Sequence, residues 1–154
     1  AMSQGCDYEK QLKETGRLVA EELGHKEWRL VYQSRSGPAS QPWLEPDILD
    51  CLREIKARGG SSDVVIAPIG FVSDHMEILF DLDTQARELC AELGLQMVRA
   101  ETVGTHPRFI RMIRELICER MAQGQPRPAL GVLGPRPDVC AADCCPMPRR
   151  PAAI

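Results

Sequence analysis

Apolar and polar positions alternate along the chain in blocks whose spacing predicts helices separated by short strands. Apolar residues recur every three or four positions in four segments, which predict helices at about residues 7–23, 46–58, 74–93 and from 106 onward. Short apolar runs lie between these segments and predict strands at residues 28–32, 63–68 and 95–99. The order α-β-α-β-α-β-α predicts an α/β domain in which helices cover a parallel sheet in three α/β/α layers.

Two loops follow predicted strands and are candidates for function. Residues 33–46 are rich in Ser, Gly and Pro and form a long loop for a compact domain, and residues 70–73 form a short glycine turn. Ligands of parallel sheets bind beyond the carboxyl ends of the strands. We therefore expect both loops at the same edge of the sheet, where they could line one cleft.

Composition narrows the class of protein. The 154 residues have room for one domain, and we expect it at residues 1–123, followed by a Pro- and Cys-rich irregular tail at 124–154. The formal net charge is -3 and the chain has no basic stripe, which argues against a nucleic-acid partner. No apolar run approaches the roughly 20 residues that a membrane span needs.

Seven cysteines fall into two groups. Four are scattered, mostly in predicted helices, which is typical of buried thiols and predicts a reducing cytoplasmic location: Cys6, Cys51, Cys90 and Cys118. The other three, Cys140, Cys144 and Cys145, lie close together near the C-terminus. That spacing indicates metal binding rather than a disulfide framework.

A carboxylate-rich segment follows the strand at 63–68. Asp74, Glu77 and Asp81 are spaced three and four apart, so a regular helix would place them on one face. Carboxylates crowded on one face repel each other unless a cation or protons lie among them, which indicates metal or proton handling. Asp74-x-x-Glu77 also fits a capping box at a helix start, and both interpretations stand.

Three stretches of the chain carry specific patterns: residues 32–38 (Tyr-Gln-Ser-Arg-Ser-Gly-Pro), 42–46 (Pro-Trp-Leu-Glu-Pro) and 68–83. They resemble the ferrochelatase family, whose members insert ferrous iron into a porphyrin in haem biosynthesis. Pro107-Arg108-Phe109, before the last helix, fits as well. The resemblance covers about residues 7–122 and implies a chelatase-like α/β domain acting on protoporphyrin IX or coproporphyrin III.

The resemblance reaches only the C-terminal half of the family, whose members have roughly twice this length and two similar halves around the porphyrin. The family's proton-abstracting histidine lies in an Ala-His-Ser block that is absent here. Ala1 precedes Met2, so we expect a tag remnant or a piece of a longer protein. The expected partners are a porphyrin and either the missing N-terminal half or a second copy of the chain.

The resemblance also implies roles for individual residues. Glu77 would be the main catalytic carboxylate and meet the Fe²⁺ substrate, Asp81 would extend an acidic line toward solvent, and His75 would support them. Arg35 would pair with a propionate or be a plain surface arginine, and Trp43 would face the macrocycle or pack in the core. The full set of expected substrate-binding residues is Tyr32, Gln33, Ser34, Arg35, Trp43, Phe71 and Ser73.

The cysteine tail is similar in placement to that of family members that carry a [2Fe–2S] cluster. Cys140, Cys144 and Cys145 would supply three thiolates, and the fourth would come from the missing half or from Cys6 or Cys118. Free or zinc-bound thiols are the alternative.

Three functional hypotheses remain. The chain is the C-terminal half of a cytoplasmic ferrochelatase, or a half-size chelatase that works as a homodimer with His75 as its base. The third is a non-catalytic module that binds porphyrin or metal. An isolated half should expose the apolar surface that meets its partner, and it should self-associate.

Overall fold

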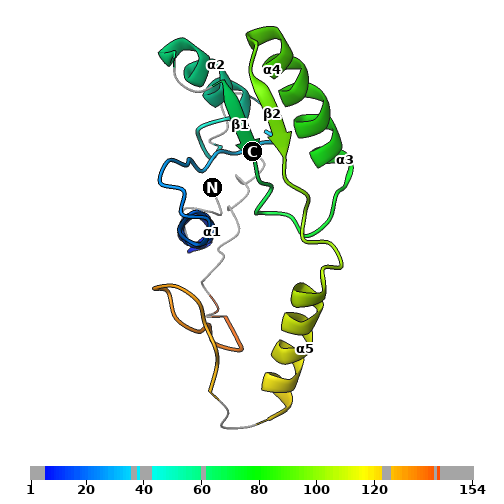
Figure 1. Cartoon of the computed structure of the whole chain (residues 1–154). Helices are drawn as coiled ribbons and strands as arrows, with labels where there is room; N and C mark the ends of the chain where they lie inside the picture. The colour runs from blue at the N-terminus through cyan, green and yellow to red at the C-terminus, as the bar shows by residue number, and fades with distance from the viewer. Residues whose placement is uncertain are drawn as a thin grey trace, which may run out of the picture. The chain divides into compact units, whose positions relative to one another are not determined.

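The computed structural model describes residues 6–35, 38, 43–59, 62–122, 126–140 and 142 (Figure 1). The chain divides into two compact units, one of residues 29–110 and the other of residues 1–28 with 111–154. These divisions do not fall at the expected border between residues 123 and 124. Residues 123–125 lie outside the described part of the chain, so that border stays a prediction.

The unit of residues 29–110 contains a parallel two-stranded sheet. Strand β1 (Asp63–Ile66) pairs with β2 (Gln96–Arg99), with Asp63 opposite Gln96 and Ile66 opposite Arg99. The connection between them is helical, in the order α3 (Met76–Ile78), the π-helical segment η2 (Leu79–Ala86) and α4 (Arg87–Leu93). This βαβ unit confirms the expected α/β class and parallel pairing.

Capping residues set the ends of the helices in this unit. Asp47 precedes α2 (Ile48–Arg58), and its carboxylate accepts a hydrogen bond of 2.8 Å from the backbone N–H of Leu49. Gly59 ends α2 and Gly94 ends α4, each with a positive φ that glycine adopts without steric cost. The helix ends predicted at about residues 58 and 93 are confirmed.

The core lies between the helices and one face of the sheet. Its buried members come from α2, from the helical connection of α3, η2 and α4, and from the residue before β2: Ile48, Leu52, Ile78, Leu82, Ala86, Cys90 and Leu95. On the opposite face, Val65 and Val98 stand opposite each other across the two strands and are 73% and 63% exposed. Within the described residues of this unit, helices therefore cover one face of the sheet.

Two predicted elements differ in the structure. The strand expected at residues 28–32 is wrong, because this segment makes only an isolated bridge between Tyr32 and Asp47. Val31 packs on the core but is not paired with a neighbouring strand. The apolar run at residues 28–32 therefore reflects burial of this side chain rather than a β-strand. The helix expected from Asp74 begins at Met76 and takes a π-helical form from Leu79.

The other unit contains helix α1 (Tyr8–Glu22) and most of α5 (Pro107–Met121). No residue of α5 is buried, and most of its apolar side chains are exposed: Ile110, Met112, Ile113, Leu116, Ile117 and Met121. Trp28 packs on Gly16 of α1, where a Cβ would lie 2.7 Å from the indole ring. Glycine at position 16 therefore makes room for the tryptophan.

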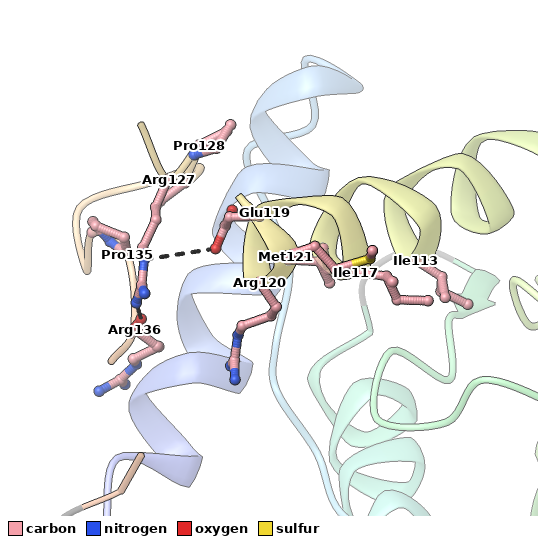
Figure 2. Close-up of a pocket in the computed structure, with 12 residues that line it drawn as sticks. Ile113, Ile117, Glu119, Arg120, Met121, Arg127, Pro128, Pro135 and Arg136 are labelled. Atoms are coloured by element: carbon pink, nitrogen blue, oxygen red, sulfur yellow. Dashed lines mark hydrogen bonds and ion pairs between the residues drawn. The ribbon is translucent and has the colours of Figure 1, made fainter. Parts of the chain in front are cut away.

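Residues 126–140 lie against both helices without helix or strand of their own. The Glu14 carboxylate accepts a 2.8 Å hydrogen bond from the N–H of Val132, and Arg136 forms an ion pair with Asp7 at 2.9 Å. Figure 2 shows Arg127 directed toward Glu119 of α5, at 3.8 Å, beside a hollow of about 660 Å³. Residues 126–140, part of the expected irregular tail, are therefore held against the two helices by ion pairs and by a hydrogen bond to a carboxylate.

Candidate active site

The loops that follow β1 and β2 lie at the same edge of the sheet, because the two strands are parallel. The other loop expected at this edge, at residues 33–46, does not follow a strand, since residues 28–32 form none. The N–H of Gly104 donates a 2.8 Å hydrogen bond to the carbonyl of Val72, which joins the two loops. The turn after β1 closes through a hydrogen bond from Phe71 N–H to the Pro68 carbonyl. This edge presents the carboxylate-rich segment.

Asp74 does not share a helical face with Glu77, contrary to the sequence prediction. His75 has an extended backbone, with φ -136° and ψ 178°, and occupies the N-cap position, so the chain is not helical at Asp74. The expected capping box also does not form, since no side-chain cap is made at this helix start. The Asp74 carboxylate instead accepts hydrogen bonds from both terminal nitrogens of Arg99, at 3.2 and 3.1 Å.

Glu77 lies in α3 beside His75. Its carboxylate oxygen Oε2 is 4.0 Å from Nδ1 of His75, and its side chain is 60% exposed. The Phe71 ring meets the His75 ring in an edge-on contact, with 4.7 Å between centroids. The neighbouring positions along the chain carry exposed apolar side chains: Val72, Met76, Leu79 and Phe80. Glu77 is thus a carboxylate within an exposed apolar stretch.

Asp81, four residues beyond Glu77, meets the loop that follows Tyr32. The hydroxyl of Ser34 donates a hydrogen bond to Oδ2 of Asp81, and Nε2 of Gln33 lies 3.5 Å from the same oxygen. Ser34 holds a φ of 59°, which non-glycine residues rarely adopt. The structure therefore brings together Gln33, Ser34 and Asp81, three of the residues that the sequence placed in one site.

Arg35 and Trp43 lie in a different place. They line a hollow of about 370 Å³ with Leu44 and Pro46 and with four carboxylates, those of Glu45, Asp47, Asp50 and Glu54. This acidic lining opposes the expected pairing of Arg35 with a propionate, although residues 36, 37 and 39–42 lie outside the described part of the chain. Tyr32 is half-buried at the bridge to Asp47, and Ser73 is exposed in the turn before Asp74.

A family model described as ferrochelatase matches residues 1–121 of this chain. The chain belongs to the ferrochelatase family. It is 58% identical over 151 residues to a protein named ferrochelatase from Rhodopirellula baltica, covering 97% of this chain and 43% of that protein. The family resemblance found in the sequence is confirmed.

Two further relatives carry a more specific name, coproporphyrin III ferrochelatase. The one from Streptomyces griseus is 55% identical over 123 residues, covering 77% of this chain and 32% of the relative. The one from Nocardia farcinica is 45% identical over 154 residues, covering 95% of this chain and 42% of the relative. The chain thus spans less than half the length of these ferrochelatases.

Sequence reasoning missed Arg99 as a site residue. It ends β2 directly opposite Ile66, the last residue of β1, so its place at the functional edge of the sheet was the available signal. Its Nε donates to Oδ1 of Asp83 at 2.7 Å, in addition to the two contacts with Asp74. These contacts hold the pKa of Asp83 below its ordinary value and raise that of Arg99.

The cysteines add no metal site to the described residues. Cys140 is exposed, and Cys144 and Cys145 lie outside the described part of the chain. Among the described residues, no group of three or more His, Cys, Asp or Glu side chains is arranged to hold a metal ion. The [2Fe–2S] cluster that the sequence resemblance implies therefore stays a prediction for this chain. None of the described helices combines the length and the apolar character that crossing a membrane requires.

Proposed function

We propose that this chain forms the carboxylate side of a ferrochelatase site, which inserts Fe²⁺ into a porphyrin and releases the two pyrrole protons. The names of the Streptomyces and Nocardia relatives support coproporphyrin III as the porphyrin, with protoporphyrin IX as the alternative. The single observation that carries the proposal is the exposed Glu77 carboxylate within an apolar stretch, four residues from an anchored Asp81.

The chemistry of metal insertion fits this arrangement. A porphyrin presents a flat apolar face, which Val72, Met76 and Phe80 would contact, and these side chains are exposed. Glu77 would then face the ring centre, where a carboxylate can accept a pyrrole proton or bind Fe²⁺ loosely enough to release it. Asp81 would receive the ion or proton next. This transfer requires that the Asp81 carboxylate keep a fixed position, and the hydrogen bond from Ser34 fixes it.

The rest of the site would come from outside the chain. The relatives are more than twice as long as the segment they share with it, which favours a partner that supplies the remaining half. The homodimer remains a second candidate, because His75 lies 4.0 Å from Glu77 and could act as the base. A non-catalytic porphyrin-binding module is the third. A cytoplasmic location and a cluster on Cys140, Cys144 and Cys145 remain predictions.

The test is anaerobic Fe²⁺ insertion into coproporphyrin III and protoporphyrin IX, followed by absorbance. The chain is assayed alone and with the part of the Rhodopirellula ferrochelatase that lies outside the shared segment. Glu77→Gln should abolish most insertion. Glu88→Gln, which replaces an exposed carboxylate on α4, should leave insertion unchanged.

Each result separates the candidates. Insertion only in the mixture supports the half-site, whereas insertion by the chain alone, with a dimer in sedimentation, supports the homodimer. Porphyrin binding without insertion in either assay supports the non-catalytic module. Insertion that is insensitive to Glu77→Gln overturns the catalytic assignment.

A further inference from the structure

Arg99 joins two carboxylates that lie on either side of Glu77 and Asp81. Its terminal nitrogens contact both oxygens of Asp74, before α3, and its Nε contacts Asp83, within η2. The side chain is only 12% exposed, and its stem comes from the last residue of β2. One guanidinium therefore ties both ends of the carboxylate segment to the edge of the sheet.

These contacts divide the acidic residues into two pairs. Asp74 and Asp83 are engaged by Arg99, and Asp83 also meets Arg87 at 3.4 Å. Glu77 and Asp81 contact no arginine in the described part of the chain, so their charges remain available to a cation. The arginine thereby also removes part of the repulsion that a run of carboxylates would create.

The π-helical form of η2 increases the need for an external anchor. A π-helix carries i→i+5 hydrogen bonds and is rare, because its geometry is less favourable than that of an α-helix. Such a segment persists where surrounding contacts fix it. Arg99 fixes Asp83 inside η2, and Ser34 fixes Asp81 two residues earlier.

We propose that Arg99 is a positioning residue that holds the Asp74–Asp83 segment so that Glu77 and Asp81 face the incoming metal ion as a pair. The metal part of this inference rests on the proposed function. The guanidinium fork is required because it reaches two carboxylates in fixed directions, which the single ammonium of a lysine does not.

The first measurement is backbone amide hydrogen exchange of the whole chain, which reports the anchor without any assumption about activity. Arg99→Gln and Arg99→Lys should accelerate exchange in peptides covering residues 74–86 and leave those covering α2 unchanged. Arg87→Gln is the matched control, because Arg87 contacts Asp83 but is more exposed and does not reach Asp74. Equal exchange in wild type and Arg99→Gln, or acceleration across the whole chain, overturns the proposal.

The second measurement is Zn²⁺ titration, with Zn²⁺ as a redox-silent probe and the Glu77→Gln variant defining the relevant binding component. Both Arg99 variants should weaken that component about tenfold, as loss of a supporting contact does at metal sites. In an Asp74→Asn/Asp83→Asn background, Arg99→Gln should have no further effect. Unchanged affinity in the Arg99 variants contradicts the positioning role. If Glu77→Gln removes no component, the proposed function fails, while the exchange data still decide whether Arg99 is the anchor.

Discussion

The hydroxyl of Ser34 and the Oδ2 atom of Asp81 form a hydrogen bond across 47 positions of sequence. It connects the loop after Tyr32 to the π-helical segment that follows α3. Ser34 makes this contact from a backbone conformation with φ 59°, which is strained for any residue but glycine. A strained residue that positions a carboxylate is an expected feature of a functional site.

Substitution of Ser34 should separate backbone strain from the side-chain contact. Ser34→Ala loses the hydrogen bond and keeps the strain, so the free energy of unfolding should fall by about 1 kcal/mol. Ser34→Gly loses the same bond but gains about 1 kcal/mol from the relaxed φ, and its stability should match wild type. Both should weaken Glu77-dependent Zn²⁺ binding, measured by titration beside urea unfolding. Wild-type affinity in both variants would show that Asp81 needs no anchor.

The Asp83–Arg99 pair should make stability depend on acidity. Arg99 lowers the pKa of Asp83 from its ordinary 3.8, so the folded state favours the charged form. The pair therefore stabilises the protein above the unfolded-state pKa, and this contribution fades as the pH falls through the folded-state value. Asp83→Asn should be about 1 kcal/mol less stable at pH 7, and the difference should shrink toward pH 3.

Urea unfolding at pH 7, 5, 4 and 3 measures that difference. Asp50→Asn is the control, because Asp50 pairs with Arg53 on the exposed surface of α2, where such pairs contribute little. A gap between wild type and Asp83→Asn that stays constant with pH would contradict the ionic origin of the effect.

Gly16→Ala should destabilise α1 although alanine is the better helix former. An alanine in an open helix position gains about 1 kcal/mol over glycine. At position 16 the new Cβ would lie 2.7 Å from the Trp28 ring, so the indole must move. We expect a lower melting temperature and a red-shifted emission of Trp28, recorded in a Trp43→Phe background. Thr15→Ala, one position away and exposed, should leave the emission unchanged.

Glu14 should hold residues 126–140 against α1. Hydrogen bonds from Arg17 and from the Val132 N–H lower the pKa of Glu14 to about 2, so the contact persists at every pH well above that value. Glu14→Gln should accelerate chymotryptic cleavage after Leu130 and Leu133, two exposed residues of this segment, about fivefold, because the segment opens more often. Glu21→Gln is a matched control, because Glu21 contacts Arg17 and is not joined to Val132. Equal cleavage in the two variants would place the anchor elsewhere.

Local sequence signals predicted most of the helices and the parallel pairing. Asp47 and Gly59 mark the ends of α2 by cap chemistry, and the apolar run at 63–68 contains β1 as expected. These features depend on neighbours in sequence, so a single chain shows them. The family also followed from the sequence, and the resemblance placed Gln33, Ser34 and Asp81 in one site, although the contact of Ser34 with Asp81 was not predicted.

The arrangement of the carboxylates did not follow, because it depends on contacts between distant residues. A regular helical period placed Asp74 with Glu77, whereas Arg99, on β2, engages Asp74 before the helix begins. The π-helical form of residues 79–86 has no signature in apolar spacing. Arg35 and Trp43 were grouped with Glu77 by resemblance, yet they line an acidic hollow whose lining does not include it.

The π-helical segment also sets the rotational phase of everything after it. Each hydrogen bond of η2 spans one residue more than a hydrogen bond of an α-helix does. Removal of one residue between 79 and 86 could therefore restore regular α-helical hydrogen bonds. Regular α-helical bonding of all eight residues, without that deletion, would instead wind the segment more tightly, rotate the residues after it and turn Cys90 out of the core. In this family member, a change that the backbone would tolerate is one that the packing would reject.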